Sequence, residues 1–524
     1  MAIIVCPQPQ AAEISLEVMR RGGNAVDAAV TCAFVQGVID PQMCSIGGCG
    51  AMLVHSAQGG DALLEFYGTA GSRTREDQWE SIFIREAADH YGYVLEGWVN
   101  DVGYQSVAVP GTVAGLHEAL TRFGTISWEE AIEPAIPFAR DGFPVTGYVH
   151  GFWTMDYGPD VVPNAQRIQT TPAAKAIYTH DGALYAIGEL MVQADLARTL
   201  ERLAHEGPDV FYKGQIADAM AADFEANGGF ITKEDLEGYT VNVTEPIRGT
   251  YRGLPVVAAG PPAGGLTLLQ MLNFLEGYDL AAHGWPSSEA ARLLVEAMAW
   301  AVADRELHIA DPRFVDIPTG ALADKHYAAK AREVIVDRAD TTHVCVVDDA
   351  GNAVSLSHTL GSSSGVVTPG LGFSYNDYMN CFDPRPGRPN SVRPGKTRVT
   401  MMTPTMVFDK NKLRVCVGAP GGTKIVSSIL QTLVNVLDHD MSPVEAVSAP
   451  RIDFQGDIVQ AEHRLPRVVC EGLERLGYRV NRRTLNYDTY FARPQLIVGE
   501  QDGYLSGASD PRKDGGAAFD TETK

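Results

Sequence analysis

The chain has 524 residues, of which 45% are hydrophobic and 20% are charged, an ordinary composition for a soluble globular protein. Its length allows one large domain or two small ones. The formal net charge of −23 argues against nucleic acid or an anionic membrane as a partner. No apolar run approaches membrane-spanning length. Residues 1–7 lack the basic lead and apolar core of a secretory signal, so we expect a cytoplasmic protein.

The side chains that usually bind metals are scattered. The eight cysteines stand mostly in apolar contexts, which favours core thiols over disulfides, and the thirteen histidines form no metal-like cluster. The glycine-rich stretch at 41–50 (PQMCSIGGCG) lacks the Lys-Ser/Thr pair of a phosphate-binding loop, so we interpret it as close backbone packing. We therefore expect neither a metal site nor a cofactor.

The first 340 residues mix helices and short strands. Asn24, with Asp27 three residues later, is a helix-capping pattern, and the apolar helix it begins, 25–38, should be buried. The patterns predict further helices at 13–21, 128–140, within 186–228, from 266 and at 287–304. They predict strands at 51–54, 63–66 and 251–258, and a loop running into a helix at 107–120.

Residues 340–360 (DTTHVCVVDDAGNAVSLSHTL) have the pattern of a β-hairpin. Two β-branched runs flank Asp349-Ala350-Gly351, and a three-residue loop ending in glycine commonly closes a hairpin. If Asp348 pairs with Asn352, then His343 faces Ser357 and Thr341 faces Thr359. Two threonine hydroxyls would then lie opposite each other at the open end of the hairpin. A slip of one residue would undo this register.

Beyond the hairpin, the sequence predicts a strand at 373–375 and an exposed, proline-rich loop at 383–396. Strands at 400–408 and 413–417 should follow. The second of these runs through Gly418-Ala419-Pro420-Gly421-Gly422 into a helix at 423–437. A glycine turn that enters a helix presents free N–H groups, which favour negative charge. A purely structural turn is the alternative.

Several of these stretches resemble the γ-glutamyltranspeptidases. Thr341-Thr342-His343, with Val346-Val347-Asp348 and Gly351-Asn352-Ala353-Val354, is similar to the start of that family's small subunit. The other matching motifs are Arg21-Gly22-Gly23-Asn24-Ala25-Val26-Asp27-Ala28-Ala29, Val109-Pro110-Gly111-Thr112-Val113-Ala114-Gly115, Pro420-Gly421-Gly422 and Gly507-Ala508-Ser509-Asp510-Pro511-Arg512. They occur in the family's order from about residue 10 to about residue 515.

The resemblance implies an α/β fold of the N-terminal-nucleophile hydrolase type, a four-layer αββα sandwich with two stacked, mainly antiparallel sheets. It also implies self-cleavage between Asp340 and Thr341. Residues 1–340 and 341–524 would then be the large-subunit and small-subunit regions of one globular unit. Thr341 would be the nucleophile, with its new α-amino group as base. Thr359 would hydrogen-bond the nucleophile, and the Gly421 and Gly422 N–H groups would form the oxyanion hole.

The departures from the family pattern concern the glutamyl group. Tyr67 stands where the family's carboxylate-binding arginine is expected, and Cys381 stands where its acid for the substrate amine is expected. An asparagine expected two residues after Thr359 is Gly361, and a serine pair becomes Thr400-Met401. The candidate substrate-binding residues are therefore Tyr67, Tyr378, Cys381, Arg398, Thr400 and Met401. Without charged partners a glutamyl group should bind poorly.

The sequence thus predicts a self-processing threonine amidohydrolase acting on a non-glutamyl amide, such as a small acid amide or an acylated amine. Cephalosporin acylases and oxamate amidohydrolase are relatives of that family in which the residues that bind the glutamyl group are altered, and both activities fit the pattern. One alternative is a genuine γ-glutamyl hydrolase or transferase with a rebuilt pocket, and another is a non-enzymatic binding protein on the same fold. The expected partners are a small-molecule amide and the two cleavage fragments as a heterodimer, with further dimerisation left open.

Overall fold

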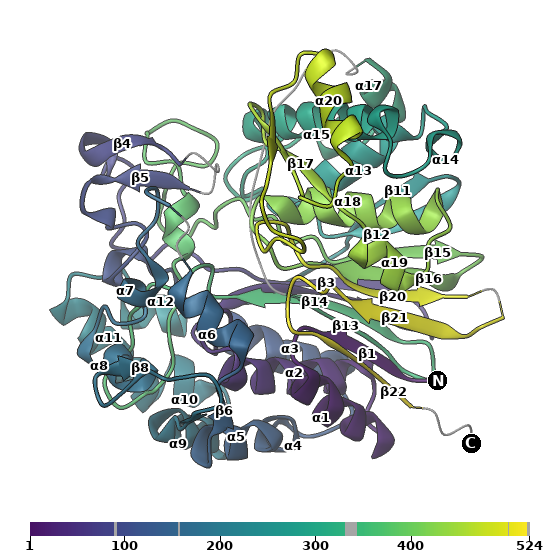
Figure 1. The fold of residues 1–524 in the computed structure, drawn as a ribbon. Helices are drawn as coiled ribbons and strands as arrows, with labels where there is room; N and C mark the ends of the chain where they lie inside the picture. Colours follow the sequence, from purple (N-terminus) through teal and green to yellow (C-terminus); the bar gives the residue numbers. More distant parts are fainter. Residues whose placement is uncertain (88–91, 156–157, 331–342, 501, 521–524) are drawn as a thin grey trace.

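Two antiparallel sheets lie face to face at the centre of the protein (Figure 1). The computed structural model describes residues 1–87, 92–155, 158–330, 343–500 and 502–520. In the first sheet the strand order is β10-β3-β2-β14-β13-β1-β22. The bounds are β1 Ile3–Cys6, β2 Cys49–His55, β3 Asp61–Phe66, β10 Asn242–Thr244, β13 His343–Val347, β14 Ala353–Thr359 and β22 Gly516–Phe519.

The second sheet has six antiparallel strands in the order β11-β12-β15-β16-β20-β21. Their bounds are β11 Ile247–Tyr251, β12 Leu254–Ala258, β15 Thr405–Asp409, β16 Lys412–Gly418, β20 Gln495–Gly499 and β21 Leu505–Ser509. β22, the last described strand, pairs with β1, the first strand, at one edge of the first sheet.

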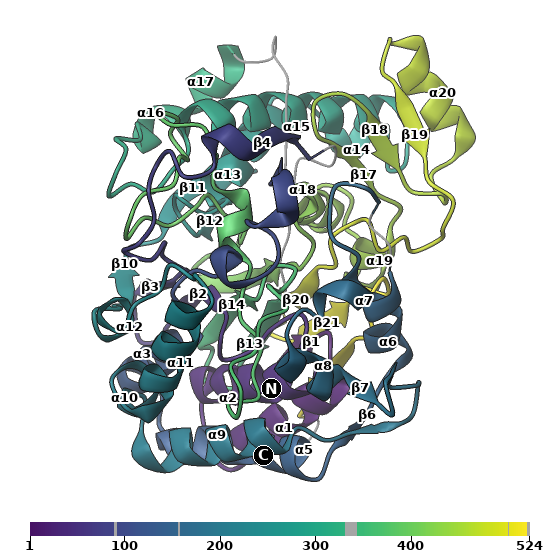
Figure 2. The same ribbon diagram turned by 90° about the vertical axis from the view of Figure 1, so that its left-hand side faces the viewer.

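Helices cover the outer face of each sheet, which makes four layers (Figures 1 and 2). The helices α1 (Pro9–Arg20), α2 (Ala25–Ile39) and α3 (Thr112–Phe123) pack on the first sheet. The helices α13 (Gly265–Leu275) and α18 (Lys424–Leu437) pack on the second, with α15 (Ser288–His308) outside α13. The predicted αββα sandwich is confirmed.

Side chains alternate along each strand, so one set packs against the helices and the other set packs between the two sheets. On β13, Val344 and Val346 face the helices, whereas Cys345 and Val347 face the second sheet. α2 is apolar nearly all round and wholly buried, as its sequence predicts, and Asn24 and Asp27 form its capping box. None of the described helices combines the length and hydropathy needed to cross a bilayer.

Three local predictions need correction. The strand expected at 251–258 begins only at Leu254, because Arg252 and Gly253 take positive φ angles of 53° and 78° and form the turn between β11 and β12. Residues 373–375 form only an isolated bridge to Gly47. The segment 383–396 is a loop as predicted but is exposed only in part, because Lys396 is buried and its Nζ donates to the carbonyls of Pro389 and Ser391.

Two predicted elements are shifted or divided. The strand expected at 400–408 begins only at Thr405, immediately after Pro404. The helix expected at 128–140 is divided into α4 (Trp128–Ile132), a 3₁₀ turn and α5 (Ile136–Arg140), at Pro134 and Pro137. Proline has no N–H to donate, which explains both boundaries.

Candidate active site

The hairpin that ends at Thr359 has the predicted register. His343 pairs with Ser357 and Val347 with Ala353, and Gly351 closes the loop with a φ of 89°. On its other side β14 pairs with β2, which sets Thr359 opposite Cys49. The Thr359 hydroxyl is buried; it accepts the Gly361 N–H at 2.8 Å and donates to the Met43 carbonyl at 3.3 Å. The predicted cleavage residues Asp340 and Thr341 lie outside the described residues.

His343 joins the two sheets at this end of the hairpin. A Cβ on Gly418 of β16 would lie 2.2 Å from the His343 ring, so only glycine fits there. The ring nitrogens lie 2.9 Å from Ser357 Oγ and 3.1 Å from Ser355 Oγ. Burial lowers the pKa of His343 to about 3. The ring is therefore neutral at ordinary pH and positions β13 against the Gly418–Gly422 turn.

The turn from β16 into α18 depends on two consecutive glycines. Gly421 has a φ of 146° and Gly422 a φ of 65°, a region that other residues avoid. A Cβ on Gly421 would lie 2.2 Å from Ala492, so the chains approach too closely for a side chain. Among the described residues, neither glycine donates its N–H to an acceptor. The turn has the character of an anion site at the N-terminus of a helix.

Three of the predicted substrate-binding residues line one cavity of about 430 Å³. Cys381 comes from the 3₁₀ turn Tyr378–Cys381, and Arg398 and Met401 come from the segment before β15. The cavity is rich in charge, being lined also by Arg305, Arg385, Arg388, Glu86, Glu306 and Asp383. A volume of this size is typical of small-molecule sites.

Of the two predicted candidates for a replacement basic residue, Arg398 lines this cavity and Lys396 does not. Its guanidinium carbon lies 4.0 Å from the centroid of the Tyr378 ring, a cation–π contact, and the side chain is buried. Its Nη1 donates to the Val399 carbonyl at 3.1 Å. Lys396 instead donates to two loop carbonyls and does not line the cavity.

Tyr67 and Thr400 do not line the cavity that Cys381 lines. Tyr67 follows β3 and faces a different cavity at the sheet edge, with its ring buried. Thr400 is buried, and its N–H donates to the Pro262 carbonyl at 3.0 Å. The structure therefore brings Cys381, Arg398 and Met401 together, with Tyr378 against Arg398. Tyr67 follows Phe66, the partner of Gly50, so it stands beside Cys49, which pairs with Thr359.

Asp377 is a buried acid at the site that sequence reasoning did not single out. Its N–H donates to the Leu360 carbonyl and its carboxylate accepts the Ser362 N–H, so it binds the segment that follows Thr359. Burial raises its pKa to about 7, while the Arg167 guanidinium at 3.5 Å opposes that rise. The only sequence signal was its place in the stretch 376–382, where the family's acid is expected.

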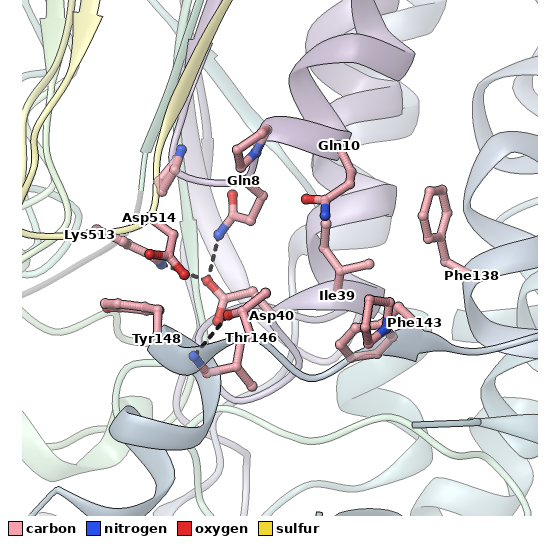
Figure 3. Close-up of a pocket in the computed structure, with 14 residues that line it drawn as sticks. Gln8, Gln10, Ile39, Asp40, Phe138, Phe143, Thr146, Tyr148, Lys513 and Asp514 are labelled. Atoms are coloured by element: carbon pink, nitrogen blue, oxygen red, sulfur yellow. Dashed lines mark hydrogen bonds and ion pairs between the residues drawn. The ribbon is translucent and has the colours of Figure 1, made fainter. Parts of the chain in front are cut away.

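A separate small cavity, of about 80 Å³, lies near the N-termini of α1 and of α6 (Gly147–Thr154) (Figure 3). At its base Asp40 accepts from Gln8 at 2.5 Å and from Lys513 at 2.6 Å (Figure 3). Gln36 connects Gln8 to His358 Nε2, whose ring faces α2. Because Thr359 faces the second sheet instead, this cavity lies on the other side of β14 from the candidate active site.

Among the described residues, no group of His, Cys, Asp and Glu side chains is arranged to hold a metal.

The family model for γ-glutamyltranspeptidase matches residues 11–520 of this chain. The chain is 37% identical to the acylase ACY 1 proenzyme of Pseudomonas sp. (strain V22), over 98% of this chain and 92% of that protein. It is 34% identical to the glutathione hydrolase proenzyme of Escherichia coli (strain K12), over 96% of this chain and 89% of that protein.

Solved structures of similar proteins superpose on the fold of this chain. A cephalosporin acylase from Bacillus halodurans superposes with a TM-score of 0.89 at 26% identity, covering 99% of this chain and 96% of its own. A γ-glutamyltranspeptidase chain from Helicobacter pylori superposes with a TM-score of 0.57 at 34% identity, covering 62% of this chain and 89% of its own.

Proposed function

Because the chain belongs to the γ-glutamyltranspeptidase family, we propose that Thr341 is the nucleophile of a self-processing threonine amidohydrolase. Members of this family have the N-terminal-nucleophile hydrolase fold and act on amide bonds, and the chain shares that fold and class of activity. One observation carries the proposal. The His343 ring packs on Gly418, so the strand that begins two residues after Thr341 abuts the turn bearing Gly421 and Gly422.

The proposed cleavage uses the Thr341 hydroxyl before the α-amino group is free. The hydroxyl attacks the Asp340 carbonyl and the peptide bond becomes an ester, which water hydrolyses. The products are a carboxylate on Asp340 and a free amine on Thr341. That amine then serves as the base for the Thr341 hydroxyl in each turnover. The name proenzyme for similar proteins supports this step.

In turnover, the Thr341 hydroxyl attacks the carbonyl carbon of the substrate amide and forms an acyl-enzyme. The developing oxyanion accepts hydrogen bonds from the Gly421 and Gly422 N–H groups, which have no acceptor among the described residues. The amine leaves with a proton, and water then releases the acid. Thr359, fixed by Met43 and Gly361, supplies a hydroxyl beside the nucleophile.

For the acyl group we propose an acid without an α-amino group and with a second negative end. Tyr67 and Cys381 stand at the two positions where the family pattern has charged partners for a glutamyl group. Arg398 lies in the cavity wall against Tyr378 and is the cation best placed for a carboxylate. The similar acylase supports an acyl-amide substrate, and the similar glutathione hydrolase keeps a rebuilt γ-glutamyl pocket as the second candidate.

The proposal is tested by the masses of the purified protein. Two fragments, 1–340 and 341–524, are expected to remain associated without a covalent link. The matched chain of the Helicobacter pylori enzyme covers 62% of this chain, and residues 1–340 make up a similar fraction of it. This similarity supports a division after residue 340. Thr341→Ala should remain one chain, whereas Thr341→Ser and the neighbouring control Thr342→Ala should be cut. Cleavage of Thr341→Ala at this bond would refute the proposal.

A further inference from the structure

A buried ion pair joins the C-terminal part of the chain to the turn that follows α2. Lys513 Nζ lies 2.6 Å from Asp40 Oδ2, and each side chain is only 1% exposed (Figure 3). Among the described residues, Asp40 is the only acid within ion-pair distance of Lys513. Asp40 belongs to the proposed large fragment and Lys513 to the proposed small fragment. Removal of either charge would leave the other one buried without its partner.

Lys513 is held in place by the residues just before it. Its N–H donates to the Asp510 carbonyl at 3.2 Å. The Asp510 carboxylate binds the guanidinium groups of Arg451 at 2.6 Å and Arg512 at 3.0 Å, and all three side chains are buried. Burial by itself would lower the pKa of Lys513, but the Asp40 carboxylate more than offsets this effect, so the pKa is raised. A firmly placed ammonium ion therefore faces Asp40.

Asp40 in turn fixes the backbone that follows α2. Its Oδ1 accepts the side-chain amide of Gln42 at 2.5 Å, and its Oδ2 also accepts that of Gln8 at 2.5 Å. The N–H groups of Met43 and Cys44 donate to the Asp40 carbonyl at 3.0 and 3.3 Å. Side chain and carbonyl thus hold successive residues of one turn, so the placement of Asp40 determines the course of the chain through Met43.

The Met43 carbonyl connects this turn to the candidate active site. It accepts the Thr359 hydroxyl at 3.3 Å and the Leu360 N–H at 2.9 Å. Among the described residues, this carbonyl is the only acceptor for the Thr359 hydroxyl. A shift of the turn would therefore change where that hydroxyl points. Misplacement of a reacting geometry by about 1 Å can cost about 10²-fold in rate.

We infer that Lys513 is a positioning residue for Thr359: through Asp40 it fixes the turn whose Met43 carbonyl orients the Thr359 hydroxyl. The inference rests on the proposed function, because it requires that Thr359 assists the Thr341 nucleophile. Lys513 and Asp40 do not contact Thr359 themselves, so their effect on the reaction is transmitted by the turn alone.

Steady-state kinetics of the cleaved, full-length protein with glutaryl-p-nitroanilide test this inference. Lys513→Met removes the charge and should lower kcat, corrected for the cleaved fraction, by about tenfold or more with little change in KM. The double variant Asp40→Asn/Lys513→Met leaves no unpaired charge, which guards against a failure to fold, and should show a similar loss. Arg252→Met, the control, takes the cation from the buried Asp438 carboxylate at 2.7 Å. It should lower the melting temperature but not kcat.

A second comparison places Lys513→Met in the Thr359→Ala background. If Lys513 acts through the Thr359 hydroxyl, the substitution should change kcat there by less than about twofold. It should still lower the melting temperature as much as it does in the presence of Thr359. A general weakening of the structure would instead lower kcat by the same factor in both backgrounds.

The outcomes separate this inference from the proposed function. Wild-type kcat in Lys513→Met, an equal loss of kcat in both backgrounds, or an equal loss in Arg252→Met would overturn the inference and leave the Thr341 nucleophile in place. Wild-type kcat in Thr359→Ala would refute the proposed use of Thr359, and the inference with it. Cleavage of Thr341→Ala would refute the proposed function itself.

Discussion

The ring of His343 occupies the space that any side chain at position 418 would need, and this contact sets the hairpin of the first sheet against the glycine turn of the second. Gly418→Ala would place a Cβ 2.2 Å from the ring, and the sheets would have to separate locally. Overpacking of this kind costs about 1–3 kcal/mol.

For Gly418→Ala we therefore expect a lower melting temperature together with slower self-cleavage. Gly151→Ala on α6 is the control, because no atom lies within 4 Å of its added Cβ. Thermal unfolding and gel analysis of the fragments give both readouts. Wild-type stability and wild-type cleavage in Gly418→Ala would show that the contact does not hold the site together.

Much of this arrangement could be predicted from the sequence, because the hairpin and the capped helix rest on local rules. The three-residue loop closed by Gly351 determines the register of the hairpin, and alternation then determines which side chains face the second sheet. The turn at Arg252-Gly253 was missed because arginine rarely adopts a positive φ. Asp377 was missed because its role depends on Arg167 and Ser362, which are distant in sequence or carry no motif.

The Gly421 turn should matter more for rate than for binding. An alanine there would require a φ of 146° and would collide with Ala492, so the N–H groups would shift. The loss of one oxyanion donor costs about 2.7–4 kcal/mol, or 10²–10³ in kcat. Gly503→Ala shares the positive φ without a collision, and steady-state kinetics on both variants should show the loss only in Gly421→Ala. Equal kcat in the two variants would exclude this role.

The buried histidines should make the protein acid-sensitive. Burial lowers the pKa of His358 to about 3, below the unfolded value of about 6.5. The unfolded chain therefore binds a proton that the folded chain does not, and stability falls as the pH falls from about 6.5 towards 3. By pH 5 this one group costs about 2 kcal/mol.

His358→Gln keeps a donor for Gln36 but cannot be protonated. Its free energy of unfolding, measured by urea titration at several pH values, should fall less between pH 7 and 5 than that of wild type. His326→Gln, at a fully exposed histidine, is the matched control and should follow wild type. Parallel pH curves for His358→Gln and wild type would contradict the account of this residue.

Substrate choice separates the two enzyme hypotheses. In this chain a γ-glutamyl anilide would lack the two charged partners that the family provides at the positions of Tyr67 and Cys381. Each of these hydrogen bonds is worth about 1.5–3 kcal/mol. We expect kcat/KM for glutaryl-p-nitroanilide to exceed that for γ-glutamyl-p-nitroanilide by about a hundredfold or more. The two assays are run side by side on the same preparation. Equal or better turnover of the glutamyl substrate would favour the rebuilt γ-glutamyl pocket.

Arg398 should carry the preference for an anionic acyl group. Arg398→Ala should lower glutaryl turnover mainly through KM, because the lost ion pair forms in the ground state as well. Arg393→Ala is the control, since Arg393 belongs to the same loop but is half exposed and pairs with Glu76. If Arg398→Ala and Arg393→Ala behave alike, then Arg398 is not the carboxylate-binding residue.

The most direct test of the central claim is to trap the acyl-enzyme and locate it. Cleaved protein is mixed with glutaryl-p-nitroanilide, quenched in acid within one turnover, digested and analysed by tandem mass spectrometry. The account predicts a glutaryl group on the Thr341 hydroxyl, at the N-terminus of the 341–524 fragment. Acylation of any other side chain in a cleaved and active preparation would contradict it.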